Sequence, residues 1–374
     1  MMQQHTHCFR STARRLPGLS LAIACAALTL LLSACGTMSV SFDEKAKAED
    51  PTPPTRFSFV FIIHGDGDYV YHDTEGRERR ANWRTLRAAI LLARRLPDTE
   101  IFIFHQRPSR KLLYVIPLPD GDFQYYRNGE LKARKPYWRS GGAFRFEAET
   151  ALYHKSATPA GPERTNFFLY FGHEISEFDG AGYDASTPER AFNVRDLSAG
   201  LKSFTGDTTR FDMLVLSTCF GGTPHTIAAL APYSRTIVAS PDNLHLSYFD
   251  LRAFTRLERF SDSDDIPGFA HYFAQQAFNR LSENVQTAVT VAVYEPDKAE
   301  NYLLTADSRY RERLSALKDP APGSIEYVDC GDEGSYVLPG MNDGVSVLFR
   351  SSRFGRAKNK LNHSGWQCCR LVTR

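Results

Sequence analysis

Five short apolar runs recur along this 374-residue chain, and they constrain its fold more than any other feature. They occupy residues 57–63, 101–104, 167–171, 213–216 and 236–239. Because these runs are short and do not alternate strictly between apolar and polar residues, we expect strands buried on both faces, as in a parallel sheet. Helical patterns such as Trp83–Leu96 and Val194–Phe204 separate them. This order predicts an α/β fold with a doubly wound, mainly parallel sheet and helices on both faces.

Two segments depart from this pattern. Residues 111–146 include Asn128-Gly129, a pair that favours a two-residue hairpin turn, so we predict a β-rich insertion between the second and third core strands. Residues 251–374 are expected to form an extension packed on the main domain, which spans residues 57–250. The extension should begin with helices and then become irregular. Its expected helices lie near residues 250–260, 267–283 and 297–317.

The N-terminus has the pattern of an exported protein. Three arginines and no acid precede the apolar stretch Leu16–Leu32, and Ser33-Ala34-Cys35 follows. A basic start, an apolar stretch and small residues before a cut define a secretory signal, here residues 1–34. A Cys at this point resembles the lipobox of bacterial lipoproteins, which implies lipid attachment at Cys35. The alternative is an uncleaved membrane anchor with an incidental Cys.

Removal of the signal leaves a nearly neutral chain. The full chain carries +2, and the signal holds three arginines, so the remainder is near −1 and has no overall field that attracts nucleic acid. Residues 35–56 are polar and Pro-rich, which predicts a lipidated tether to the membrane. Gly36 stands where Asp would resemble an inner-membrane retention signal. We therefore expect an outer-membrane anchor that faces the periplasm or the cell surface. No feature of the sequence indicates an oligomeric state.

Four cysteines remain for the folded part of the exported chain. Three lie in the last 45 residues (Cys330, Cys368 and Cys369), while Cys219 stands more than a hundred residues away. In an oxidising compartment a disulfide of Cys330 with Cys368 or Cys369 is expected, and both pairings are open. Cys219 is then a lone thiol, which makes it a candidate reactive group.

Polar residues follow each apolar run. They are His64, His105, His173, Cys219 and the turn Ser240–Asp242. Because ligands bind outside the carboxyl ends of the strands in open parallel sheets, these are the positions where chemistry is expected. For a single His or Cys at a strand end, a purely structural role as a buried or hydrogen-bonded side chain is at least as common as a catalytic role.

His173 and Cys219 are stronger catalytic candidates as a pair than either residue is alone. If the third and fourth strands are neighbours, both side chains project from the same edge of the sheet. A Cys with a His in reach is the minimum for nucleophilic acyl transfer, in which a thiolate attacks a carbonyl and an imidazole protonates the leaving amine. Thr223-Pro224 starts a helix just after Cys219, and its dipole favours a thiolate.

The order of these features resembles the clostripain family of cysteine peptidases, in the caspase–gingipain–clostripain group. The features are an apolar strand ending in His173, a Gly- and Asp-rich loop at residues 177–182, an amphipathic helix, and an apolar strand ending in Cys219. A strand ending in Val238-Ala239-Ser240 completes the set. The resemblance covers about residues 57–250.

This resemblance implies a caspase-like fold and a membrane-anchored endopeptidase that acts on a peptide or protein. It also implies a dyad of His173 and Cys219, with the backbone N–H groups of Glu174 and Cys219 forming the oxyanion site. No metal and no organic cofactor are implied.

Two positions depart from the family pattern. Glu174 replaces the usual Gly after the His, and its carboxylate would oppose the developing oxyanion unless it points away. Ser217 stands where an Asp often lies near the pocket for a basic side chain. Together with Ser240, Asp242 could line that pocket and supply the missing negative charge, although an Asp that only completes a turn is equally consistent.

Other classes of protein remain as alternatives. A non-catalytic binding lipoprotein could keep the fold and use its cleft or its β-insertion. The segments Phe61–Gly65 and Ser217–Gly221 resemble the oxyanion turn and nucleophile elbow of an α/β-hydrolase esterase, but Ser217 replaces the elbow's Gly. Asp66, Asp68 and Asp73 could bind Ca²⁺, although their spacing matches no known loop and a solvated turn is the simpler explanation.

Overall fold

A computed structural model describes most of the chain after residue 53. The described ranges are residues 54–67, 70–72, 77–139, 145–159, 164–178, 180–206, 209–244, 249–260, 265–315 and 325–371. The chain divides into two units, residues 1–52 and 53–374, and all of the described residues belong to the second. Cys35, the signal and most of the tether lie outside the described residues. Among the helices of the described ranges, none has the length and apolar character needed to cross a membrane.

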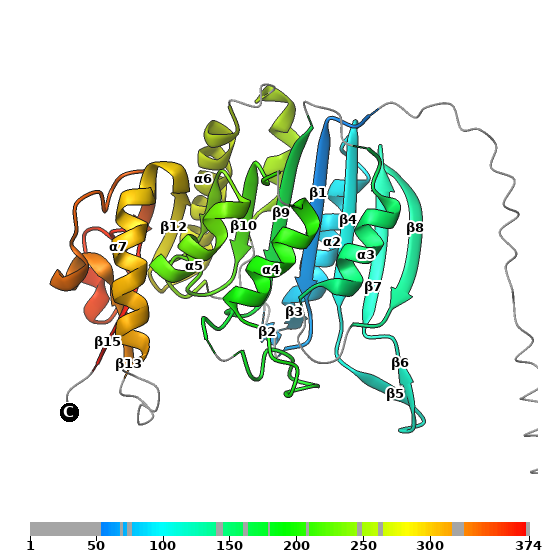
Figure 1. The fold of residues 1–374 in the computed structure, drawn as a ribbon, viewed down its shortest axis with the longest axis horizontal. Helices are drawn as coiled ribbons and strands as arrows, with labels where there is room; N and C mark the ends of the chain where they lie inside the picture. The colour runs from blue at the N-terminus through cyan, green and yellow to red at the C-terminus, as the bar shows by residue number, and fades with distance from the viewer. Residues whose placement is uncertain are drawn as a thin grey trace, which may run out of the picture. The chain divides into compact units, whose positions relative to one another are not determined.

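A nine-stranded sheet forms the centre of the second unit, in the order β14-β12-β11-β10-β9-β1-β4-β7-β8 (Figure 1). Its five central strands are parallel. They are β1 (Phe57–His64), β4 (Thr99–Gln106), β9 (Thr165–Phe171), β10 (Met213–Ser217) and β11 (Ile237–Ala239). Each corresponds to one of the five apolar runs, and each is buried along most of its length. The predicted doubly wound, mainly parallel sheet is confirmed.

Antiparallel strands extend the sheet at both edges. The strands β7 (Gly121–Arg127) and β8 (Glu130–Tyr137) pair next to β4 and are joined at Asn128-Gly129, the predicted turn. At the other edge β12 (Val289–Tyr294) and β14 (Val345–Arg350) follow β11. The predicted β-rich segment is therefore an extension of the main sheet. The C-terminal part contributes strands where only helices and irregular chain were expected.

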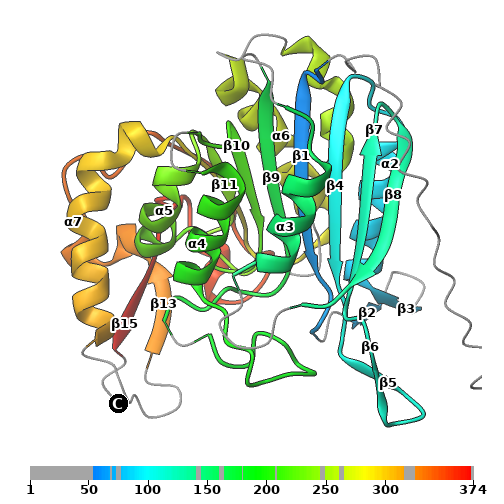
Figure 2. The same cartoon turned by 45° about the vertical axis from the view of Figure 1, so that its right-hand side comes forward.

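Helices cover both faces of the sheet (Figure 2). One face carries α2 (Ala81–Ala93), the 3₁₀ helix η2 (Leu251–Arg259) and α6 (Ile266–Asn284). The opposite face carries α3 (Glu147–Ser156), α4 (Val194–Thr205), α5 (Pro224–Leu230) and α7 (Pro296–Ser315). The three helices expected after residue 250 are present as η2, α6 and α7.

Shorter elements complete the fold. The paired strands outside the main sheet are β2 (Val70–His72) with β3 (Glu78–Arg80), β5 (Arg110–Leu112) with β6 (Ile116–Leu118), and β13 (Ile325–Asp329) with β15 (Gln367–Leu371). Short 3₁₀ turns lie at η1 (Ala231–Tyr233), η4 (Cys330–Asp332), η5 (Gly334–Tyr336) and η6 (Arg356–Asn359). Cys330 and Cys368 form a disulfide, while Cys369 is a buried free thiol.

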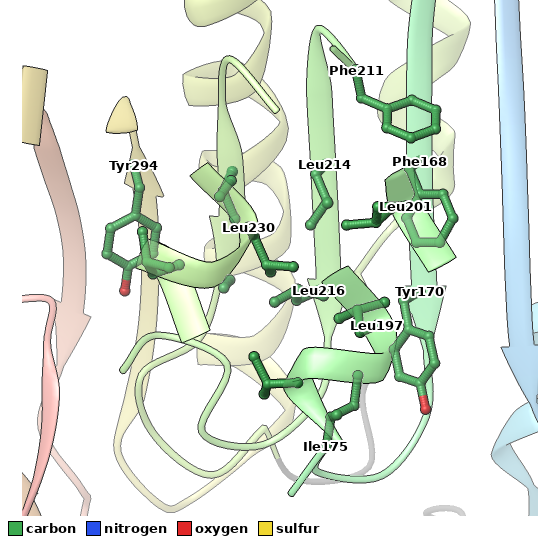
Figure 3. Packing of buried hydrophobic residues seen from close by; sticks show 14 of the residues in the cluster. Phe168, Tyr170, Ile175, Leu197, Leu201, Phe211, Leu214, Leu216, Leu230 and Tyr294 are labelled. Atoms are coloured by element: carbon green, nitrogen blue, oxygen red, sulfur yellow. The ribbon is translucent and has the colours of Figure 1, made fainter. Parts of the chain in front are cut away.

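The helix α4 shows how the sequence pattern produces packing. Asn193 caps it by accepting a hydrogen bond from the Asp196 backbone N–H, and the Asp196 carboxylate accepts one in return from the Asn193 N–H. Leu197 and Leu201 then face β9 and β10, as predicted from their spacing (Figure 3). Burying Leu side chains of this kind contributes about 1.5–3 kcal/mol each. This packing fixes the two strands that precede His173 and Cys219.

Candidate active site

The strands β9 and β10 are direct neighbours, and their register brings the chain segments of His173 and Cys219 to the same edge. Phe171 pairs with Ser217 at the end of the parallel ladder. His173 and Cys219 each follow two residues later, so they occupy equivalent positions beyond the two strands. The Gly172 N–H donates to the Ser217 carbonyl at 3.3 Å, which keeps the two segments together past the last ladder pair. The side chain of His173 is exposed and that of Cys219 is half-buried.

The thiol of Cys219 is held by the segment that follows β11. Its Sγ donates to Oδ1 of Asn243 at 2.9 Å. Burial raises the pKa of the Cys219 thiol, the Leu244 backbone N–H opposes that shift, and the charge of Glu174 adds to it. The free site therefore holds a neutral thiol rather than a thiolate. Attack on a carbonyl would need a base that removes the thiol proton.

The loop after Cys219 is tightly packed. Phe220 has a left-handed backbone (φ 52°), and its N–H donates to the Asp242 carbonyl at 3.2 Å. A Cβ on Gly222 would lie 2.9 Å from Cα of Pro241, so the close approach of the two loops requires Gly at this position. Thr223 then caps α5 by accepting from the Thr226 N–H at 3.0 Å. These contacts fix the position of the Cys219 segment.

Glu177 links the His173 segment to the Cys219 segment. Its Oε1 accepts hydrogen bonds from the hydroxyls of Thr223 and Thr226, at the start of α5. Its Oε2 accepts from the Tyr310 hydroxyl of α7 at 2.7 Å. Burial raises the pKa of Glu177, while the hydrogen bonds from Thr223 and Tyr310 oppose that shift. This positioning residue was not foreseen, because its partners lie 46 and 133 residues away in the chain.

Glu174 is an acidic residue whose charge acts on the thiol of Cys219. Part of its side chain is exposed, yet desolvation by the surrounding chain, and then repulsion from Glu177, raises the pKa of Glu174 to about 7. The same carboxylate raises the pKa of the Cys219 thiol. The ionised carboxylate of Glu174 would therefore oppose negative charge at the site. Protonation of Glu174 near neutral pH would remove this repulsion.

The three residues predicted for a substrate pocket differ in their surroundings. Ser217 is 2% exposed, and its hydroxyl has no hydrogen-bond partner within the described residues. The Ser240 hydroxyl donates to the Asp242 carbonyl at 3.0 Å. The Asp242 carboxylate accepts from the Thr290 hydroxyl and lies 3.5 Å from Nε2 of His363. Burial raises the pKa of Asp242, but His363 and Thr290 outweigh it and hold that pKa below its usual value.

His64 lies in a buried ionic cluster beneath the same edge. Its Nε2 is 2.8 Å from Oδ1 of Asp184. The same oxygen accepts from Arg139 at 2.9 Å, and Oδ2 of Asp184 accepts from Arg190 at 2.7 Å. Burial lowers the pKa of His64 to about 4, and the hydrogen bond to Asp184 opposes part of that shift. Burial therefore favours the neutral form of His64 at physiological pH.

The remaining strand-end His is buried as well. His105 is buried, and its pKa is lowered to about 4, chiefly by that burial. Of the three strand-end histidines, only His173 reaches the surface. In the proposed Ca²⁺ segment Asp66 is engaged by Ser186, while Asp68 and Asp73 lie outside the described residues. Across the described ranges, no group of three or more His, Cys, Asp or Glu side chains is arranged to hold a metal.

The C-terminal part contacts both segments of the candidate site. The Gln367 N–H donates to the Gly222 carbonyl at 3.0 Å. The ring of Tyr327 stacks on Phe220, with centroids 5.0 Å apart and planes at 13°. Together with Tyr310 on Glu177, these contacts make β13, β15 and α7 supports of the site.

Comparison with known proteins identifies the fold. No family profile matches the sequence, and no curated protein matches it. Among solved structures, a secreted C11 cysteine protease of Bacteroides thetaiotaomicron, iotapain, aligns with a TM-score of 0.53 at 10% identity and covers 84% of this chain and 93% of its own. The same organism's secreted C11 protease in complex with an irreversible peptide inhibitor aligns at 0.54 and 13%, covering 85% and 89%.

An inactive zymogen C11 protease from Parabacteroides distasonis aligns similarly, with a TM-score of 0.55 at 13% identity over 85% of this chain and 92% of its own. Each alignment includes more than four-fifths of both chains. The resemblance stated from the sequence motifs is confirmed at the level of the fold. This chain has the fold of the clostripain-family, or C11, cysteine proteases.

Proposed function

We propose that the protein is a membrane-anchored, extracytoplasmic cysteine endopeptidase with Cys219 as nucleophile and His173 as general acid and base. The observation that carries the proposal is the equivalent register of these two residues beyond neighbouring parallel strands, in a fold known from cysteine proteases. A structural Cys or His needs no such pairing at the ligand-binding edge of a sheet.

The reaction would begin with transfer of the Cys219 proton to His173, because burial keeps the resting thiol neutral. The thiolate would attack the carbonyl of the scissile peptide bond, and the backbone N–H groups of Cys219 and Glu174 would stabilise the oxyanion. The imidazolium of His173 would then protonate the leaving amine. Water, deprotonated by the same imidazole, would hydrolyse the acyl-enzyme and restore the thiol.

The dyad is tested by Cys219→Ala and His173→Ala on a mixed peptide library. Each should lower hydrolysis by at least about a thousandfold, since nucleophile and base act as a unit. Thermal midpoints should stay within a few degrees of wild type, because both side chains lie beyond the ends of their strands. His271→Ala, an exposed histidine on α6, is the matched control and should retain full activity. Hydrolysis by Cys219→Ala at the wild-type rate would exclude the dyad.

A binding lipoprotein with the same fold is the second candidate function, because Glu174 and Ser217 replace residues usual in the family. A peptidyl acyloxymethyl ketone distinguishes the two. Covalent labelling of Cys219 supports the peptidase, whereas an unlabelled and inactive wild type supports the binder. The esterase alternative has less support, since Ser217 stands where a nucleophile elbow requires Gly.

The membrane anchor is proposed from the sequence alone, with lipid at Cys35 and the outer membrane as the site. Cys35→Ala should abolish incorporation of labelled palmitate and leave the signal uncleaved. Palmitate that persists in this variant would contradict the anchor without bearing on the dyad.

A further inference from the structure

The hairpin β5–β6 presents a run of exposed apolar side chains. All five residues from Leu112 to Ile116 are more than half exposed, and the three at the tip, Leu113, Tyr114 and Val115, are 76%, 96% and 75% exposed. The hairpin follows the carboxyl end of β4 and projects beyond the edge of the sheet that carries the candidate site (Figures 1 and 2). Contiguous exposed apolar side chains mark a surface that binds a protein or a membrane.

The backbone conformation of the tip is unfavourable for the bulky residues that it carries. Leu113 and Tyr114 have φ of 49° and 60°, a left-handed conformation that disfavours bulky residues. The neighbouring hairpin β7–β8 uses Asn128 and Gly129 at its two left-handed positions, which are the residues that such turns favour. The tip thus carries Leu and Tyr where Asn and Gly would be less strained and more soluble.

A basic cavity lies at the base of this hairpin. It has a volume of about 230 Å³, and its lining includes the guanidinium-bearing side chains of Arg80, Arg107 and Arg110 together with Trp83 and His105. Among the described residues that line it, none is acidic. Arg110 is also the first residue of β5, so the cavity and the apolar tip belong to one continuous surface.

The base of the hairpin is fixed to the body of the protein. The Ser109 N–H donates to the Ser186 hydroxyl at 2.7 Å, and Ser186 is in turn held by Asp66. Arg107 donates to the carbonyls of Pro119 and Gly121 at 3.3 and 3.2 Å. The tip and the cavity therefore keep a constant relation to the edge where His173 and Cys219 lie.

We propose that the β5–β6 hairpin inserts its tip into a lipid bilayer and that the cavity at its base binds the phosphate of an anionic phospholipid. The apolar side chains lie at the tip of the hairpin and the arginines lie at its base. This arrangement matches the order of acyl chains and headgroups in a bilayer. Guanidinium groups bind phosphate by paired, charge-assisted hydrogen bonds. Together with the lipid proposed at Cys35, this contact would turn the candidate site towards the membrane surface.

A tether of residues 36–56 is long enough to permit this orientation. An extended chain of that length spans up to roughly 70 Å. A strand such as β1, with eight residues, is about 27 Å long. A lipid at Cys35 and an inserted hairpin at the opposite end of β1 could therefore be accommodated at one membrane.

The experiment uses the unacylated chain from Gly36 to Arg374, which retains the complete second unit. Co-sedimentation is measured with phosphatidylcholine vesicles that contain or lack phosphatidylglycerol. Wild type should bind vesicles that contain phosphatidylglycerol at least about tenfold more tightly than vesicles of phosphatidylcholine alone. Added salt should weaken this binding. Leu113→Ser/Val115→Ser should reduce binding by about tenfold or more, while Leu361→Ser, at a residue 94% exposed elsewhere, should not.

The cavity is tested with Arg80→Gln/Arg110→Gln, which should abolish the preference for phosphatidylglycerol, against Arg195→Gln on the exposed surface of α4. Insertion is read from Tyr114→Trp, whose emission should be quenched by phospholipids brominated in their acyl chains. Equal binding to both kinds of vesicle, an unaffected tip variant, or an unquenched Trp would overturn the proposal and indicate a protein partner. Because none of these readouts needs Cys219, they are independent of the proposed peptidase activity.

Discussion

The charge on Glu174 should control the reactivity of Cys219, and Glu174→Gln tests this directly. Desolvation and repulsion from Glu177 place the pKa of Glu174 at about 7. Above that pH the carboxylate is ionised and raises the pKa of the Cys219 thiol. Gln has nearly the same shape and no charge, so the variant lacks this repulsion. The thiol pKa should therefore be lower in the variant at alkaline pH.

The magnitude follows from the partial exposure of Glu174. A repulsion of about 1 kcal/mol for such a pair corresponds to about a fivefold change in the ionisation equilibrium of the thiol. Below the thiol pKa this raises the thiolate fraction about fivefold, and the lower nucleophilicity of a less basic thiolate cancels about half of the gain. Alkylation of Cys219 by iodoacetamide should thus be about two to three times faster in Glu174→Gln near pH 8.

The pH dependence provides the sharper test. Wild-type Glu174 is protonated below its pKa of about 7, so wild type and variant should react at equal rates at about pH 6 and diverge as the pH rises. Glu189→Gln, which removes an exposed acid from the same loop region, should match wild type throughout. A rate ratio that is constant with pH, or a slower Glu174→Gln at pH 8, would refute the reasoning.

Two further predictions concern stability. Asp184→Ala should lower the free energy of unfolding in urea by about 3–5 kcal/mol, because it removes the buried carboxylate that pairs with both Arg139 and Arg190. A loss below about 1 kcal/mol would contradict this reasoning. Reduction of the Cys330–Cys368 disulfide, whose residues are 38 apart, should cost about 4 kcal/mol from loop entropy. An unchanged urea midpoint in reductant would contradict it.

The sequence pattern was sufficient for the central sheet because each buried strand carries its own signal. Phe57–His64 and Met213–Ser217 are buried at every position, and such uniform apolar runs occur where helices cover both faces. Once these strands are parallel, the residues after them must lie on one edge. The placement of His173 and Cys219 on that edge required no knowledge of any long-range contact.

The groups that hold the site could not be foreseen in the same way. Glu177 and Asp184 owe their roles to partners far along the chain, and nothing in their local sequence indicates those partners. The strands Val289–Tyr294 and Val345–Arg350 are different, since their β-branched residues are typical of strands. That signal was present and could have corrected the expectation of an irregular C-terminal part.

The placement of Asp242 bears on substrate specificity. Its carboxylate is engaged by Thr290 and lies 3.5 Å from His363, while its carbonyl accepts from Phe220 and Ser240. A substrate Arg would have to compete with His363 for this carboxylate, so the net gain from pairing would be smaller than for a free Asp. The contacts instead connect β12 and the C-terminal part to the loop that holds Cys219. Asp242 is thus better suited to hold the loop that contains Cys219 than to select a basic residue.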